Sequence, residues 1–159
     1  MEEQAPRKSR RRKAPSASVR ALLEEFSAFG DLSPAVFSKL CEDFEGPFRA
    51  TPGQCLFRQG DTGDYVYFVL EGEVETRRGG RALCRHPRGA FVGEAALLGS
   101  TPGQRLCSAA PHGGDCALLR MGHLDFRGSL SLRGGLSILA APSYLRHLRR
   151  AGVPPSAPR

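Results

Sequence analysis

The sequence lacks the long apolar segments of membrane-spanning and secreted precursor proteins. No apolar run approaches the roughly 18 residues needed to cross a bilayer. The N-terminus is acidic and then basic, whereas a signal peptide needs an apolar stretch. We therefore predict neither a membrane span nor a signal peptide, and we expect a cytoplasmic protein, with the nucleus as the alternative compartment.

Metal-site and enzyme signatures are also missing. The 5 cysteines are widely spaced without a Cys-x-x-Cys pair, and the 4 histidines show no ligand spacing. The sequence has no P-loop and no nucleophile–base motif. We expect no metal, no cofactor and no catalytic residue, hence a protein that is not an enzyme. The cysteines are interpreted as small buried residues of a reducing compartment.

Acidic residues are missing from one end of the chain. Residues 127–159 contain 6 arginines and no acid, while the whole chain has a net charge of +7. Residues 1–20 are also strongly basic, so the central part is mildly acidic. A nucleic-acid-binding fold usually carries its positive charge on the folded body. This distribution argues against nucleic acid as a partner.

The periodicity of apolar residues divides the chain into three parts. Residues 1–18 are rich in Pro, Ser and like charges, which predicts a disordered basic arm. A helical spacing begins at Val19, and Ser33-Pro34 predicts the start of a second helix, so helices are expected over 19–45. The period then changes to two over 46–123, with glycine-rich turns between short strands, including a strand pair near 105–110 and 116–121.

The fold class is therefore predicted as mainly β with flanking helices: an antiparallel, jelly-roll-like β-roll. The domain is expected to span 19–132. A helix is indicated near 124–130, but Gly134-Gly135 and Pro142 interrupt the pattern that follows. Residues 133–159 are thus expected to hold only short C-terminal helices and a tail.

Four segments together resemble the cyclic nucleotide-binding domain family, the β-roll of catabolite activators and of cAMP-dependent kinase regulatory subunits. They are "FGDLSPAVFSKL", "GQCLFRQGDTGDYVYFVLEGEVE", "GAFVGEAALL" and "ALLRMGHLDFRGSL". The run of Gly60-Asp61, Gly63-Asp64 and Gly72 is specific only in combination, and these glycines are interpreted as turn formers. The resemblance implies a regulatory sensor that binds cAMP or cGMP. The alternative is a degenerate domain that acts as a protein-interaction scaffold without ligand.

The resemblance also implies where the ligand would bind. In the family, the segment matching 93–98 is a phosphate-binding cassette, in which a strand end leads into a very short helix. Glycine permits close approach, helix amides bind the anion, and Glu94 accepts a hydrogen bond from the ribose 2′-hydroxyl. Alternatively, Glu94 caps the short helix. Apolar side chains of the roll would contact the base. The candidate residues are Gly93, Glu94, Ala95, Ala96, Leu97, Gly103, Gln104, Arg105, Val69 and Leu83.

One position departs from the family's pattern. There the cassette continues into Pro-Arg, and this arginine holds the cyclic phosphate, whereas here Pro102 is followed by Gly103. Arg105 lies two residues further along. Either its side chain turns back towards the phosphate, or it is a solvated or locally paired surface arginine. The departure puts the affinity for nucleotide in doubt, and the fold is unaffected.

Protein partners are indicated only by the two ends of the chain. The stretch "RRKAPSASV" (11–19), which overlaps the basic segment 7–13, resembles the inhibitory segment of kinase regulatory subunits, which docks on a kinase. A nuclear-localisation or nucleic-acid-contacting arm and a merely solvated charge run are the alternatives. The C-terminal segment is a second candidate contact surface, and Tyr144 within it either stacks on the base or packs on the roll.

Overall fold

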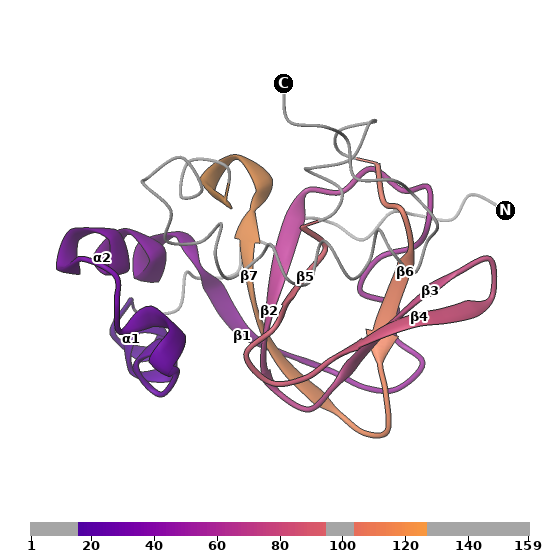
Figure 1. Cartoon of the computed structure of the whole chain (residues 1–159), viewed down its shortest axis with the longest axis horizontal. Coiled ribbons are helices and arrows are strands. Elements are labelled where there is room, and N and C mark those ends of the chain that lie inside the picture. Colours follow the sequence, from indigo (N-terminus) through magenta and orange to yellow (C-terminus); the bar gives the residue numbers. More distant parts are fainter. Residues whose placement is uncertain (1–15, 95–103, 127–159) are drawn as a thin grey trace, which may run out of the picture.

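Helices and strands segregate in space as the change of period predicts, with the helices beside one of two sheets (Figure 1). The computed structural model describes residues 16–94 and 104–126. No helix in these ranges is long and apolar enough to cross a membrane. The elements in chain order are α1 (Ser16–Glu24), η1 (Ser27–Phe29), α2 (Pro34–Asp43), β1 (Glu45–Ala50), β2 (Tyr65–Glu71), β3 (Val74–Arg78), β4 (Arg81–His86), β5 (Phe91–Val92), β6 (Ser108–Pro111) and β7 (Cys116–Gly122).

The first helix differs from its predicted boundaries. α1 begins at Ser16, before the expected start at Val19, and it ends at Glu24. Phe26 is extended, and a single 3-10 turn, η1, follows it. Phe26 and Phe29 are both buried in the core beside the sheet. Apolar spacing thus continues past the end of α1 because the turn keeps both rings directed at the same core.

The second helix begins as predicted. The Ser33 hydroxyl accepts a hydrogen bond from the Val36 amide at 3.3 Å, and Pro34 occupies the first turn. A serine at this position satisfies an amide that the helix itself leaves without an acceptor. Proline is tolerated there because its missing N–H is not needed. α2 is therefore fixed at its start by local sequence.

The strands form two antiparallel sheets, in the orders β1-β7-β2-β5 and β4-β3-β6. The predicted pairing of segments 105–110 and 116–121 is wrong. β6 pairs with β3, whereas β7 pairs with β1 and β2, so the two consecutive strands lie in different sheets. The chain crosses from one sheet to the other in between, at Gly113 with φ +77°. The fold is the predicted antiparallel roll, but this strand pairing differs from the prediction.

The core has two parts, separated by the larger sheet. In β2, alternate residues Val66, Phe68 and Leu70 pack against the helices, where Phe68 contacts several other aromatic rings. Tyr67 and Val69 face the opposite way and contribute to a second cluster between the two sheets. This alternation is the period-two pattern of a strand buried on both faces. The second cluster forms the interior of the roll.

Four of the five cysteines are buried, as predicted. Cys41, Cys84, Cys107 and Cys116 are buried, but Cys55 is exposed, which corrects the expectation for that residue. Residues 123–126 are helical after β7. Residues 16–18, predicted as the end of a disordered arm, belong to α1, which corrects that expectation. The rest of the basic arm and the predicted short C-terminal helices lie outside the described residues.

Candidate functional site

The predicted cassette begins inside the roll. β5 pairs with β2 and carries the chain to Gly93 and Glu94, both of which are buried. Gly93 has φ +94°, a conformation that other residues rarely adopt. The Glu94 side chain is 0% exposed. Candidate residues Ala95, Ala96, Leu97 and Gly103 lie outside the described residues, so the predicted helix amides are not described.

Arg105 is buried, so it is not the surface residue that one alternative expected, although it does pair locally. It is 4% exposed, and its guanidinium reaches back to the start of the cassette. Nη1 donates a hydrogen bond to the Gly93 carbonyl oxygen at 3.0 Å, and Nη2 donates one to the Tyr65 carbonyl oxygen at 2.6 Å. The structure therefore brings Arg105 together with Gly93, the residue adjacent to Glu94.

Backbone pairing explains why the Arg105 side chain points inward. The Arg105 amide donates to the Asp61 carbonyl oxygen, and the Gly60 amide donates to the Arg105 carbonyl oxygen, both at 2.8 Å. From there to β6, residues alternate: Arg105, Cys107 and Ala109 are buried. Gln104 is exposed, so this candidate residue faces away from the interior. The period-two rule thus places Arg105 on the inner face.

The Arg105 guanidinium contacts an aromatic ring and occupies space that two glycines leave open. The Arg105 Cζ lies 3.9 Å from the centroid of the Phe57 ring, within the range of a cation–π contact. A Cβ atom added to Gly63 would collide with the guanidinium, and one added to Gly93 would lie 2.5 Å from Nη1. Gly63 is therefore more than the turn former that the sequence indicated. The sequence analysis also missed Phe57, whose only signal is its place among the turns before β2.

The site contains a permanent positive charge in a largely dry environment. Burial lowers the pKa of the Arg105 guanidinium, and nearby groups, Glu94 among them, oppose this shift. An arginine stays protonated in proteins even so. Burial also raises the pKa of the Cys107 thiol to about 12, so the thiol is uncharged. Electrostatic interactions are strong where water is excluded, which favours an anionic ligand beside Arg105.

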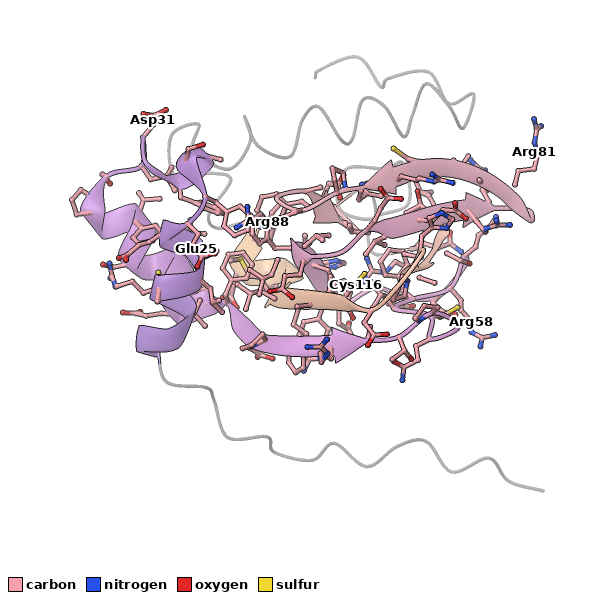
Figure 2. All side chains as sticks on the ribbon, turned by 90° about the horizontal axis from the view of Figure 1, so that it is seen from below. Glu25, Asp31, Arg58, Arg81, Arg88 and Cys116 are labelled. Carbon is pink, nitrogen blue, oxygen red and sulfur yellow. The ribbon has the colours of Figure 1, made fainter. Side chains whose placement is uncertain are left out.

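The two candidate base-contacting residues belong to the interior cluster. Val69 is fully buried in it, and Leu83 is partly buried against it. Arg58 and Arg81, in contrast, point away from the body (Figure 2). Within the described residues, no group of three or more His, Cys, Asp or Glu side chains could hold a metal ion.

Comparison with known proteins gives one family. A sequence profile for the family described as "Cyclic nucleotide-binding domain" matches residues 47–131, more than half of the chain. The cAMP-dependent protein kinase regulatory subunit of Mycosarcoma maydis is 31% identical over 127 residues, which cover 74% of this chain and 24% of the relative. That of Hypocrea atroviridis is 31% identical over 80 residues, covering 50% of this chain and 17% of the relative.

Comparison of the fold with solved structures gives a match of the same kind. The solved structure "Sp-2Cl-cAMPS bound to PKAR CBD2" matches with a TM-score of 0.68 at 18% identity, covering 90% of this chain and 98% of that one. At this identity the likeness establishes the fold alone. The chain spans about a quarter or less of the two curated relatives. These comparisons give no support to a ligand-free scaffold.

Proposed function

Because the chain belongs to the cyclic nucleotide-binding domain family, we propose that it is a non-enzymatic sensor module that binds a cyclic purine nucleotide, cAMP or cGMP, inside the roll. The observation that carries the proposal is the buried Arg105 guanidinium, which is hydrogen-bonded to Gly93. Glu94 would bind the ribose, and Arg105 would bind the cyclic phosphate.

Arg105 is suited to the phosphate by its charge and by its fixed position. An arginine presents five N–H donors, and the described residues accept hydrogen bonds from Nη1 and Nη2 but not from the buried Nε. Its contacts with Phe57 and with two carbonyl oxygens hold the group in place before any ligand arrives. A group that is already positioned loses little conformational entropy on binding. Arg105 thus takes the role of the arginine that the family has directly after the proline.

Glu94 supplies the complementary interaction. A carboxylate beside a phosphate repels it unless a hydroxyl group lies between them, and a nucleoside provides such a hydroxyl on its ribose. Glu94 is buried and follows Gly93 directly in the chain. Because Arg105 is hydrogen-bonded to the Gly93 carbonyl oxygen, Gly93 links the two side chains. The arrangement therefore favours a ribonucleotide over free phosphate.

Calorimetric titration of cAMP and cGMP into the protein tests this proposal. We expect the wild type to bind at least one of the two, and Arg105→Ala to weaken that binding about 10- to 150-fold, the effect of losing one charge-assisted contact. Glu94→Gln should also weaken binding, because the amide is a poorer acceptor for the ribose hydroxyl. This loss would occur although the substitution removes an acidic group near the phosphate. Loss of affinity in both variants supports the two roles.

Arg81→Ala is the matched control, because Arg81 is exposed and points away from the roll (Figure 2). It removes the same charge at a distance from the site and should bind like the wild type. If the wild type binds neither nucleotide, or if Arg105→Ala binds both as the wild type does, the proposed site is wrong. Regulation of a kinase through the basic segment 7–13 stays a prediction, because that segment lies outside the described residues.

A further inference from the structure

A second arginine faces the interior of the roll. In β3 the inner positions alternate with outer ones: Val74 and Thr76 are buried, and Arg78 follows them on the same face. Arg77 lies between them and turns outward, where its Nε donates a hydrogen bond to Glu75 at 2.7 Å. The two adjacent arginines thus have different surroundings, and only Arg78 is on the inner face.

The pairing of β3 with β6 places Arg78 near the proposed phosphate site. Thr76 pairs with Ala109 and Arg77 with Ser108, where this ladder ends. Arg78 and Cys107 are the next residues along the two segments. Cys107 is two residues from Arg105 on the same inner face. Burial raises the pKa of the Cys107 thiol, and the nearby charges of Arg105 and Arg78 act against this shift. Arg78 and Arg105 therefore both lie near this buried thiol.

The Arg78 side chain has donor capacity that the described residues do not use. Its Nη1 atom is buried, yet it has no hydrogen-bond acceptor within reach in 16–94 or 104–126. A buried N–H without an acceptor is unfavourable, so such a group calls for an explanation. A ligand with acceptor atoms at this end of the interior would provide one.

We propose that Arg78 recognises the purine base and makes the site prefer guanine over adenine. The inference rests on the proposed function, since it needs the ribose on Glu94 and the phosphate on Arg105. Guanine presents two adjacent acceptors, O6 and N7, which an arginine can bind with two parallel hydrogen bonds. Adenine presents one acceptor and one amino donor on the same edge, and arginine has only donors. Arg78 therefore pairs well with guanine and poorly with adenine.

The other residues of this region suit a polar base edge. Thr76 is fully buried beside Arg78's position in β3, and its hydroxyl lies 3.3 Å from the buried His86 Nε2. Leu83, partly buried in the neighbouring strand β4, supplies an apolar surface. A purine has two apolar faces and a polar edge. Leu83 would contact a face of the base, and the polar side chains would lie toward its edge. The region thus differs from an interior lined with apolar side chains only.

The test measures the ratio of two affinities within one protein sample. Calorimetric titrations of cGMP, cAMP and cIMP into the wild type should give tighter binding of cGMP, by about 5- to 150-fold over cAMP. cIMP keeps O6 and N7 but lacks the amino group of guanine, so it should follow cGMP. In Arg78→Ala the preference should disappear, with the affinity for cAMP nearly unchanged.

Two further variants sharpen the interpretation. Arg78→Lys keeps the charge but loses the two parallel hydrogen bonds, so most of the preference should be lost. Arg81→Ala removes the charge of the residue that pairs with Arg78 across the hairpin, and it should leave the preference intact. Because each ratio comes from one sample, a partly unfolded variant still reports it.

Four outcomes would overturn the inference. A wild type that binds cAMP as well as cGMP or better excludes a guanine preference. An equal loss of affinity for both nucleotides in Arg78→Ala would place Arg78 at the phosphate and not at the base. Absence of any binding by the wild type would remove the proposed function itself, and a preference unchanged in Arg78→Ala would refute only the role of Arg78.

Discussion

The Arg105 guanidinium donates a hydrogen bond to the Gly93 carbonyl oxygen at 3.0 Å, so it is attached to the residue that precedes Glu94. Two buried side chains, those of Arg105 and Glu94, are thereby both linked to Gly93, one through a hydrogen bond and the other through the peptide bond. This relationship joins the end of β5 to the segment before β6. It also makes the position of Arg105 depend on the space that nearby glycines leave open.

Gly63→Ala should weaken nucleotide binding. The added Cβ would collide with the Arg105 guanidinium and displace it from the Gly93 carbonyl oxygen. We expect an affinity loss of about 10- to 150-fold in a calorimetric titration, comparable to losing the charged contact itself. Gly114→Ala is the matched control, because nothing lies within 4 Å of its added Cβ and neither glycine has a left-handed φ. If both variants bind nucleotide equally well, the position of Arg105 does not depend on the space beside Gly63.

Leu119→Ala should destabilise the roll far more than Leu124→Ala. Leu119 is fully buried between the larger sheet and the helices, whereas Leu124 is 82% exposed. Truncating a buried leucine costs about 2–5 kcal/mol of unfolding free energy, and an exposed one changes it by about 0.5 kcal/mol or less. Urea denaturation followed by circular dichroism measures both. A similar cost for the two variants would mean that the core is not packed as described.

His123 should make the protein less stable in mild acid. Burial, and then the charge of Arg105, lower the pKa of this half-buried histidine below its ordinary 6.5, although the Tyr65 backbone opposes the shift. The unfolded chain therefore takes up the proton at a higher pH than the folded protein does. The free energy of unfolding is unaffected by His123 above about pH 7.5 and falls as the pH drops through about 6.5.

Urea denaturation at pH 7.5 and at pH 5.5 checks this expectation. The loss of stability between the two pH values should be smaller in His123→Gln than in the wild type, because glutamine does not titrate. His112→Gln is a suitable comparison, since His112 lies on the other sheet and contacts Glu75 at 3.4 Å. An identical pH dependence of the wild type and His123→Gln would show that His123 has the same pKa in both states.

Thiol alkylation should distinguish Cys55 from Cys107. The thiolate is the reactive form, and Cys55 is exposed, whereas Cys107 is buried with a pKa of about 12. With iodoacetamide at pH 8, peptide mass spectrometry should find Cys55 modified first and Cys107 protected until urea is added. Rapid modification of Cys107 in the folded protein would contradict the closed interior beside Arg105.

Local sequence was sufficient for several features. The glycine turns and the period of two predicted the roll, and Ser33-Pro34 predicted the start of α2, because turns and helix caps depend on neighbouring residues only. The position of Glu94 at a strand end was also predictable. The exact limits of α1 were not, because the packing of Phe26 and Phe29 against the sheet ends the helix at Glu24.

The sequence by itself determined the fold class, the family and the place of Glu94 just after a buried strand, since each depends on short stretches of residue types. Only the tertiary structure decided which face of a strand is the inner one. The period of two groups Arg105 with Cys107 and Ala109, but the long-range pairing with Gly60 and Asp61 turns this group inward. The same kind of pairing places β6 and β7 in different sheets and brings the end of β3 beside the start of β6, and no local pattern contains that information.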